Sequence, residues 1–236
     1  MGLNVSVVVP CLTEQEWQVE LTKAVISIAR LTTEVPFELI VAEAAGFPSA
    51  GGYFSSHGPT DVPCKHFYNS QKGSANADMN KGMDLASGDV VVLLTNDVFV
   101  KPGWLEALLE CFERVPDCGM ASLGTSDHRE QSVNVITEGL WCPLMALRNR
   151  PDFRFDAETF PSYWGDSDLV MRVYNAGFRA YRNRRVVCDH LGRATNTPSH
   201  PQGGSGEIEA ARQRFVARHG PSHQLIFRVL MDGLIV

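Results

Sequence analysis

The segment Asp89-Val-Val-Val-Leu-Leu94, followed at once by Thr95-Asn96-Asp97, constrains the fold of this chain more than any other. Five consecutive apolar residues between polar ones predict a short strand buried on both faces, as in a parallel sheet covered by helices. Asp97 then falls where the strand leaves the sheet. We therefore expect a carboxylate at the carboxyl edge of a parallel sheet, where such sheets bind ligands.

The start of the chain predicts a β-α-β unit. Asn4–Pro10 is a β-branched run ended by proline, Glu14–Leu31 carries apolar residues at helical spacing, and Phe37–Ala42 is a second apolar run. A crossover helix of this length implies that the two strands are parallel in one sheet.

Strands and helices continue to alternate along the chain. We expect further strands at Lys65–Tyr68, Met120–Leu123, Val133–Ile136 and Arg185–Asp189, and helices at Ala75–Ala86, Pro102–Phe112, Asp166–Ala176 and Glu207–His219. Gly- and Pro-rich residues 46–63 predict a loop. This pattern predicts an α/β fold with an open, mainly parallel sheet.

Composition sets wider limits. A chain of 236 residues with 44% hydrophobic residues can build one domain, which excludes a disordered chain, a collagen-like repeat and a disulfide-stapled miniprotein. No apolar run approaches the roughly 18–20 residues of a membrane span. Met1–Pro10 has no secretion-signal pattern. We therefore expect a cytoplasmic protein with no membrane span.

The cysteines show no metal-binding or disulfide spacing. No two of them form a CxxC pair, so we expect reduced, mostly buried thiols without a chemical role. The six are Cys11, Cys64, Cys111, Cys118, Cys142 and Cys188.

The net charge of −6 is unevenly distributed. Residues 141–236 contain thirteen arginines and no lysine against nine carboxylates, whereas residues 1–140 contain eight basic and eighteen acidic residues. The arginines of 179–185 either face an anion, since guanidinium binds phosphate well, or form a solvated surface stretch. An acidic chain argues against strong nonspecific nucleic-acid binding.

Asp97 has two readings from spacing alone. A carboxylate at the floor of a crevice is costly to bury without compensation, and a divalent cation that bridges to substrate phosphates would offset that cost. Alternatively, Asp97 caps the following helix or binds loop amides.

The segments around Asp97 resemble glycosyltransferase family 2, inverting enzymes with the GT-A fold. The family has a D-x-D or N-N-D triplet and then a proline-started helix, as in Thr95-Asn96-Asp97 and Pro102-Gly-Trp104. An N-N-D type triplet points to its rhamnosyltransferase-like subset. The family's opening strands and its approach to the triplet are similar to Val5–Pro10, Glu38–Glu43, Asn80-Lys-Gly82 and Ala86–Asp89.

The resemblance continues downstream. Tyr163–Arg172 with Ala176-Gly-Phe178 is similar to the family's "ED.DL..R…AG(F/Y)", and Asp189–Arg193 to its closing "H..G". It implies a single Rossmann-like GT-A domain over residues 1–195, with a nucleotide-sugar half (1–115) and an acceptor and catalytic half (116–195). Residues 196–236 would add a flexible segment, a helix and a tail.

The resemblance also implies roles for individual residues. Asp97 would hold Mn²⁺ or Mg²⁺ on the diphosphate with His190 as a further ligand, and Asp166 would be the general base, although a helix cap is its plain alternative. Acceptor contacts would come from Trp141, Trp164 and Asp168. Donor contacts would come from Pro10, Thr13, Glu14, Glu43, Lys72, Asn80, Thr95, Asn96 and Arg193.

This sequence departs from the family pattern at several points. Thr95 opens the triplet, which leaves one carboxylate there, and Gly165 replaces the acidic residue before the base. Glu43 stands for a shorter Asp, and Lys72-Gly-Ser74 replaces an Asn-Gly-aromatic segment. These departures leave the identity of the donor unreadable.

We therefore expect a metal-dependent inverting glycosyltransferase that uses a nucleoside-diphosphate sugar. A nucleotidyltransferase would need a glycine-rich basic loop where Pro10–Glu14 stands. A non-catalytic sugar- or nucleotide-binding module stays open. The acceptor is a glycan, a small molecule, a protein or a modified nucleic-acid base. Residues 196–206 are a candidate lid, and the apolar tail Leu225–Val236 either finishes one chain or pairs two.

Overall fold

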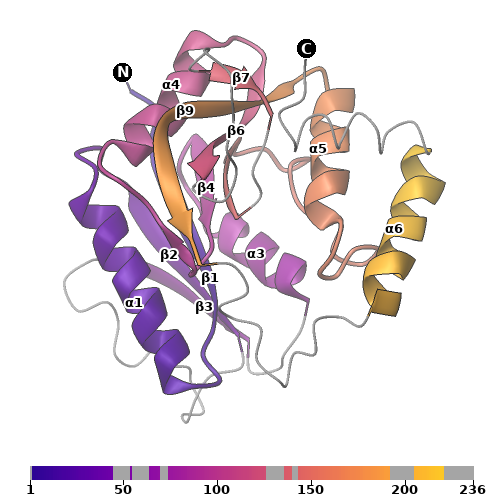
Figure 1. Cartoon of the computed structure of the whole chain (residues 1–236), viewed down its shortest axis with the longest axis horizontal. Helices are drawn as coiled ribbons and strands as arrows, with labels where there is room; N and C mark the ends of the chain where they lie inside the picture. The colour runs from indigo at the N-terminus through magenta and orange to yellow at the C-terminus, as the bar shows by residue number, and fades with distance from the viewer. Residues whose placement is uncertain are drawn as a thin grey trace.

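The computed structural model is a three-layer α/β domain built around one twisted sheet (Figure 1). It describes residues 2–44, 54, 64–69, 74–125, 136–139, 143–191 and 205–220. Most of the predicted lid 196–206 and the tail Leu225–Val236 lie outside this part of the chain, and the last two lid residues, 205 and 206, begin a helix. Most of the loop 46–63 and the first three residues of the strand expected at Val133–Ile136 also lie outside it.

The first half of the sheet is parallel. Strands β1 (Val5–Leu12), β2 (Glu38–Ala44), β3 (Cys64–Asn69) and β4 (Val90–Leu94) lie in the order β3-β2-β1-β4. Val7 pairs with Leu39 on one side and with Val92 on the other. The β-α-β opening is therefore confirmed, with the carboxyl ends of β1, β2 and β4 at one edge.

The second half of the sheet is mixed. Strand β8 (Leu144–Arg148) pairs antiparallel with both β4 and β6 (Cys118–Thr125), and β6 pairs parallel with β9 (Arg179–His190). The short strands β5 (Val98–Phe99) and β7 (Ile136–Glu138) pair antiparallel with β9. Because β4, β6 and β9 run in the same direction as β1, the sheet is mainly parallel, as expected.

Helices cover both faces of the sheet. Helices α1 (Glu16–Leu31) and α4 (Trp104–Arg114) pack on one face, against a core that includes Val7, Val92 and Leu94. Helices α3 (Ala75–Asp84) and α5 (Gly165–Asn175) pack on the other, against Val8, Val91 and Leu93. Successive side chains of β4 thus point alternately into the cores on the two faces of the sheet, which explains why its sequence is apolar throughout.

Helix α6 (Ser205–His219) lies outside α5 (Figure 1). Its Phe215 is fully buried in a small separate core with Phe160 and Met171, and the partly buried Trp164 packs against that core. This third core fixes α6 against α5 and the loop that precedes α5.

Two strands were not predicted, and two were predicted much too short: β6 has eight residues where four were expected, and β9 has twelve where five were expected. Leu144–Arg148 has a single polar residue and no β-branched residue, so it lacks a strand signature, although its first four residues are buried at the centre of the sheet. The two-residue β5 is too short to show a pattern. Strand β9 begins at Arg179, six residues before the predicted start at Arg185.

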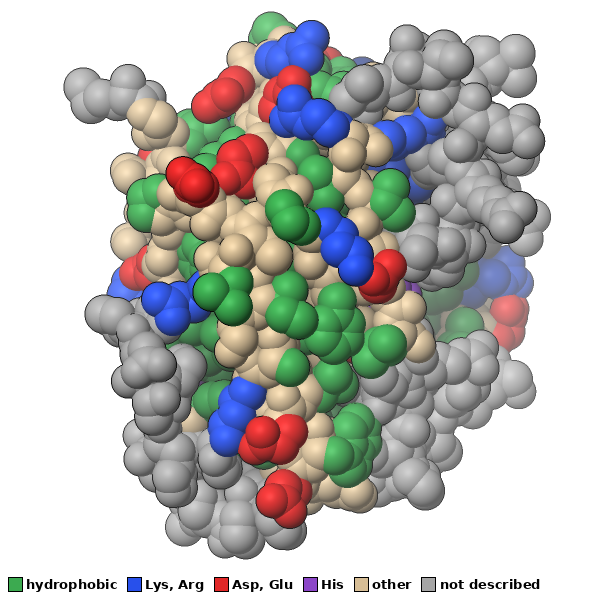
Figure 2. Space-filling model, turned by 60° about the vertical axis from the view of Figure 1, so that its left-hand side comes forward, with side chains coloured by type: hydrophobic (Ala, Val, Ile, Leu, Met, Phe, Trp, Pro, Cys, Tyr) green, Lys and Arg blue, Asp and Glu red, His purple; other side chains and the backbone are tan. Residues whose placement is uncertain are grey.

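The arginine-rich stretch is not simply a solvated surface. Arg182 is 2% exposed inside β9, so that reading is wrong for this residue, while Arg185 forms an exposed ion pair with Glu110. Figure 2 shows a face on which Lys and Arg side chains are interspersed with Asp and Glu. Such a surface does not provide the continuous basic band that nucleic acid would need there.

Five of the six cysteines lie in the described part of the chain, and all five are free thiols, four of them buried. The prediction of reduced, mostly buried thiols is confirmed for these residues. Among the described helices, none combines the length and the apolar character needed to cross a bilayer.

Candidate active site

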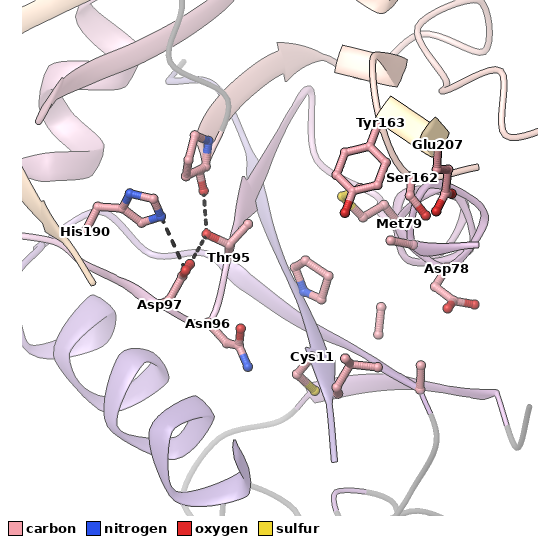
Figure 3. A pocket seen from close by; sticks show the side chains of 16 residues that line it. Cys11, Asp78, Met79, Thr95, Asn96, Asp97, Ser162, Tyr163, His190 and Glu207 are labelled. Atoms are coloured by element: carbon pink, nitrogen blue, oxygen red, sulfur yellow. Dashed lines mark hydrogen bonds and ion pairs between the residues drawn. The ribbon is translucent and has the colours of Figure 1, made fainter. Parts of the chain in front are cut away.

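A cavity of about 470 Å³ opens at the carboxyl ends of β1, β2 and β4 (Figure 3). The parallel strands and the helix α3 supply its floor, and the loop before α5 and the first turn of α6 supply its far side. Its walls are Pro10, Cys11, Leu12, Ala42, Ala44, Ala75, Asp78, Met79, Thr95, Asn96, Asp97, Pro143, Ser162, Tyr163, His190 and Glu207. Of the predicted site residues, it brings together Pro10, Thr95, Asn96, Asp97 and His190.

Asp97 and His190 meet because β5 pairs with the end of β9. Val98, next to Asp97, pairs with His190, and the amide of Leu191 donates to the carbonyl of Asp97 over 3.0 Å. The imidazole Nε2 lies 3.3 Å from Asp97 Oδ2 (Figure 3). Residues almost a hundred positions apart thus present an oxygen and a nitrogen to the same cavity.

The rest of the triplet orients this carboxylate. Thr95 Oγ1 donates to Asp97 Oδ1 over 2.8 Å and lies 3.0 Å from the carbonyl oxygen of Pro143. Asn96 Nδ2 donates to Thr22 Oγ1 of α1 over 3.1 Å. Thr95 therefore supports Asp97 through a hydroxyl, where the family resemblance placed an acidic or amide side chain.

This pair fits a divalent cation only together with ligands from a substrate. In the described part of the chain, no three His, Cys, Asp or Glu side chains cluster closely enough to form a protein-only metal site. One carboxylate oxygen and one imidazole nitrogen leave most positions of a six-coordinate ion open. Diphosphate oxygens and water are suitable to fill those positions.

Glu43 does not line the cavity, which corrects its expected donor contact. Alternation along β2 turns Ala42 and Ala44 toward the cavity and Glu43 toward the α1 face. Its fully buried carboxylate accepts hydrogen bonds from Thr13 Oγ1 at 2.6 Å and from the amide of Phe54 at 3.1 Å, and it lies 2.9 Å from His66 Nε2. The fold uses Glu43 and Thr13 as a buried anchor.

Asn80 also has a different task from the expected one. Its side-chain amide donates to the carbonyl of Phe155 and accepts from the amide of Phe155, both over 2.8 Å. It therefore ties α3 to the loop before α5 and does not line the cavity. Glu14 is half-buried just after β1 and is likewise not among the described residues that form the cavity wall.

Asp166 lies in the first turn of α5, three residues after the cavity residue Tyr163, and is itself not among the described residues that form the cavity wall. Its Oδ1 accepts a hydrogen bond from the amide of Ser167 over 2.7 Å. The preceding Trp164 has a φ of 65°, a left-handed conformation that is uncommon for a side chain of this size. Such strain is typical of functional sites, because the surrounding structure must enforce it.

The close approach of α3 explains why glycine precedes Asp166. A Cβ at Gly165 would lie 2.1 Å from Asn76 Nδ2, which donates to the carbonyl of Phe160 over 2.5 Å. No side chain fits there without breaking this contact. An acidic residue at this position would therefore require Asn76 to move, and Asp166 is the first carboxylate of the helix.

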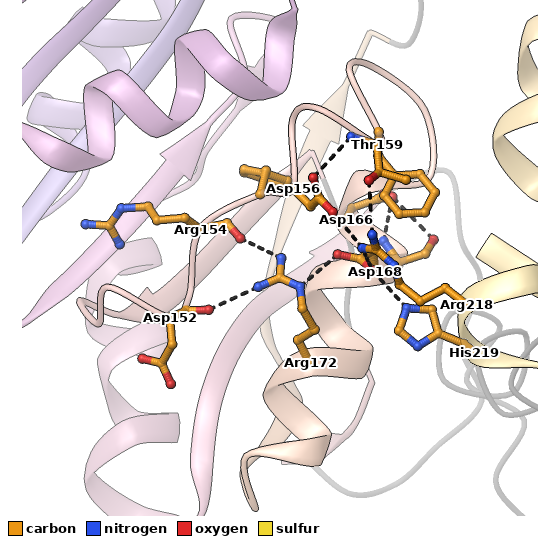
Figure 4. Close-up of polar contacts among 12 residues, drawn as sticks. Asp152, Arg154, Asp156, Thr159, Asp166, Asp168, Arg172, Arg218 and His219 are labelled. Carbon is orange, nitrogen blue, oxygen red and sulfur yellow. Dashed lines mark hydrogen bonds and ion pairs between the residues drawn. The ribbon is translucent and has the colours of Figure 1, made fainter. Parts of the chain in front are cut away.

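Asp168 is buried away from the cavity, which corrects its expected acceptor contact (Figure 4). Its Oδ2 accepts from Arg172 Nε over 2.8 Å. Its Oδ1 accepts from Arg218 over 2.9 Å and lies 2.8 Å from His219 Nε2. Burial would raise the pKa of Asp168, but these hydrogen bonds outweigh burial and lower it.

Trp164, the other described residue expected to contact an acceptor, packs on α6. Its ring lies 5.1 Å from the ring of Phe215, centroid to centroid. It is absent from the cavity wall. Lys72, Trp141 and Arg193 lie outside the described residues, so their expected roles remain predictions.

Sequence reasoning missed two carboxylates of the cavity. Asp78, one turn into α3 from Ala75, is almost fully buried and accepts from Asn69 Nδ2 over 2.9 Å. Burial raises the pKa of Asp78, more than this hydrogen bond lowers it. Glu207 comes from α6, after a segment without periodicity. The helical spacing of Ala75, Asp78 and Met79 was the only available signal for the first of the two.

Cys11 lies on the cavity wall but is not set up for chemistry. Burial, assisted by the nearby Glu43 carboxylate, strongly raises the pKa of its thiol. A protonated thiol is a poor nucleophile and a poor metal ligand. The prediction that the cysteines have no chemical role therefore agrees with the surroundings of Cys11.

Solved structures share this architecture. A GalNAc-T7 structure with UDP, GalNAc and Mn²⁺ has a TM-score of 0.67 at 12% identity, covering 96% of this chain and 50% of that one. The mannosyltransferase PcManGT from Pyrobaculum calidifontis, in complex with GDP-Man and Mn²⁺, has a TM-score of 0.59 at 15% identity, covering 98% and 74%. At these identities the likeness establishes the GT-A fold alone.

Sequence comparisons identify the family. A curated relative, the glucosyl-dolichyl phosphate glucuronosyltransferase of Haloferax volcanii, is 29% identical over 115 residues, 49% of this chain and 36% of its own length. This chain thus matches about a third of that relative. The model of glycosyl transferase family 2 matches residues 6–166, more than half of the chain and including Asp97 and Asp166. The chain therefore belongs to glycosyl transferase family 2.

Proposed function

We propose that this protein is a metal-dependent, inverting glycosyltransferase that moves a sugar from a nucleoside-diphosphate donor to an acceptor hydroxyl. One observation carries the proposal: Asp97 and His190 present two metal-ligand atoms, 3.3 Å apart, to a cavity at the carboxyl edge of the sheet. Family membership and neighbours solved with Mn²⁺ and UDP or GDP-Man support the same reading.

Asp97 and His190 are the residues that would hold the cation. When bound, a divalent cation neutralises the charge that grows on the departing nucleoside diphosphate. A nitrogen in the donor set suits Mn²⁺ better than Mg²⁺, which prefers oxygen ligands alone. Thr95 would keep the Asp97 carboxylate turned toward the ion, because its hydroxyl occupies one lone pair of Oδ1.

Asp166 would act as the general base. In the proposed step, its carboxylate takes the proton of the acceptor hydroxyl as that oxygen attacks the anomeric carbon from the face opposite the diphosphate. The bond from this carbon to the diphosphate oxygen breaks, and the configuration inverts.

The replacement Asp166→Ala tests the catalytic part of the proposal. Donor hydrolysis, with water as the acceptor, is followed as release of UDP or GDP from their glucose and mannose conjugates with Mn²⁺. We expect turnover to fall by about 10²–10⁴-fold, the usual contribution of a general base, with donor binding unchanged. Asp152→Asn is the matched control, because the Asp152 carboxylate is exposed and pairs with the neighbouring Arg150.

Wild-type turnover in Asp166→Ala would contradict the assignment of the base. Donor binding by the wild-type protein without any turnover would instead favour a binding module on a transferase scaffold. Equal loss of activity in Asp152→Asn would show that the assay reports folding of the region before α5.

A further inference from the structure

Helix α6 lies beyond residue 166, where the match to the family model ends, yet it reaches the cavity. Its first turn supplies Glu207 to the cavity wall, and its last turn carries Arg218 and His219. Arg218 lies eleven positions after Glu207 in the helix, which corresponds to roughly 16 Å along the axis. The helix therefore connects the cavity to the buried carboxylate of Asp168.

The C-terminal end of α6 is firmly attached to the structure around the proposed base. Arg218 donates to Asp168 Oδ1 at 2.9 Å and to Thr159 Oγ1 at 3.0 Å, and its Nη1 lies 2.7 Å from Asp156 Oδ2 (Figure 4). His219 adds its contact with Asp168, two residues from Asp166. The same helix buries Phe215 against Trp164. α6 and the start of α5 thus form one rigid unit.

Glu207 itself is exposed toward the cavity, unlike the anchored end of its helix. In the view of Figure 3, Glu207, Ser162 and Tyr163 occupy the side of the cavity away from Asp97 and His190. This side therefore offers a carboxylate, a hydroxyl and an aromatic ring. These groups suit the hydroxyls and the apolar face of a sugar ring.

We propose that Glu207 contacts the acceptor, and that the acceptor is an uncharged carbohydrate at this position. The inference rests on the proposed function, because it assigns the opposite side of the cavity to the donor diphosphate. A carboxylate accepts hydrogen bonds from sugar hydroxyls, whereas it repels a phosphate or carboxylate group. A phosphorylated acceptor is therefore disfavoured at this contact.

Binding of defined probes tests this assignment. Saturation-transfer NMR measures binding of p-nitrophenyl glucosides, galactosides and mannosides, and of glucose 6-phosphate and mannose 6-phosphate, with Mn²⁺ and either UDP or GDP. We expect the neutral glycosides to bind and the phosphorylated sugars to bind more weakly. Glu207→Gln should weaken binding of the neutral glycosides about 10-fold, since it removes a charged hydrogen-bond acceptor.

Glu209→Gln is the matched control on the same helix. Glu209 pairs with Arg212 away from the cavity, so this variant should bind the probes as the wild type does. The proposal is wrong if no neutral glycoside binds, if the phosphorylated sugars bind more tightly, or if Glu207→Gln binds like the wild type.

A separate readout distinguishes this failure from that of the proposed function. Thermal stabilisation by UDP or GDP with Mn²⁺ reports the donor side alone and should be the same in Glu207→Gln and in the wild type. If nucleotide and Mn²⁺ stabilise both proteins but Glu207→Gln binds the glycosides as the wild type does, only the role of Glu207 is refuted. If no nucleotide with Mn²⁺ stabilises the wild type, the donor site itself is refuted.

Discussion

Two carboxylates of this chain, Asp97 and Asp168, have similar partners but opposite surroundings. Each lies near the end of an element and within about 3 Å of a histidine, at 3.3 Å for Asp97 and 2.8 Å for Asp168. Asp97 lines a cavity and has a threonine and a histidine beside it. Asp168 is fully buried and is surrounded by two arginines and a histidine.

The two carboxylates differ in how their charge is compensated. Three basic side chains of the protein surround Asp168, so its charge needs no ligand for compensation. The charge of Asp97 has no arginine or lysine among the described residues of the cavity wall, and a cation that arrives with the donor can compensate it. The charged partners, rather than the residue type, therefore distinguish the structural carboxylate of Asp168 from the metal ligand that we propose at Asp97.

The largest effect on stability should come from Asp168→Asn. Removing one partner of a buried ion pair leaves the other charges uncompensated and costs about 3–5 kcal/mol. At about 2–4 °C per kcal/mol for a chain of this size, the melting temperature should fall by roughly 6–20 °C. Calorimetry measures this change. The exposed Asp152→Asn should change stability by less than about 1 kcal/mol, and equal losses would remove the distinction between the two sites.

A third carboxylate, Glu38, has a structural role, and this role can be tested through the pH dependence of stability. Burial would raise its pKa, but hydrogen bonds from Lys65, Ser6 and Ser87 lower it to about 2. A lowered folded-state pKa stabilises the protein above the ordinary value near 4.5, and this stability is lost as the pH falls toward 2.

Chemical denaturation between pH 6 and pH 2 measures this contribution. The free energy of unfolding should fall more steeply with decreasing pH in the wild type than in Glu38→Gln. Parallel curves for the two proteins would mean that Glu38 has the same pKa in the folded and unfolded chains.

A smaller effect is expected at the open site. His190→Asn should leave the melting temperature near that of the wild type and weaken Mn²⁺ binding in the presence of a nucleoside diphosphate. Loss of a residue that only hydrogen-bonds to a metal ligand lowers metal affinity about 10–100-fold. Loss of a ligand itself should lower the affinity at least as much. Titration calorimetry gives the affinity.

His66→Gln is the matched control for this titration. His66 is also paired with a buried carboxylate, that of Glu43, but it does not line the cavity. An equal loss of Mn²⁺ affinity in both histidine variants would mean that the effect is structural and that His190 is not a ligand.

Local patterns predicted much of the fold. The apolar run before Asp97 and the helical spacing of α1 and α4 placed the parallel half of the sheet and its carboxyl edge, so the placement of Asp97 and Pro10 could be foreseen. Strand β8 could not be predicted, because its sequence Leu-Met-Ala-Leu-Arg has no strand preference. The segment forms a strand because it pairs with β4 on one side and with β6 on the other.

The site was predictable only where its residues follow strands directly. Asp168 was assigned to the acceptor because its partners Arg218 and His219 lie 50 and 51 residues further along the chain. Glu43 was assigned to the donor because its residue type fits, although the alternation of β2 turns it to the opposite face. Glu207 follows a stretch without periodicity, so no pattern connected it to the cavity.

The most direct test of the central claim is thermal stabilisation by nucleotides in the wild type and in Asp97→Asn. UDP, GDP, dTDP and CMP are each compared with Mn²⁺ and with EDTA. At a ligand concentration of 100 times the Kd, we expect a stabilisation of about 2.7 kcal/mol, or roughly 5–10 °C, for one nucleoside diphosphate with Mn²⁺ only. Asp97→Asn should show no such stabilisation. An equal Mn²⁺-dependent shift in Asp97→Asn, or no shift in the wild type, would contradict the metal site proposed at Asp97.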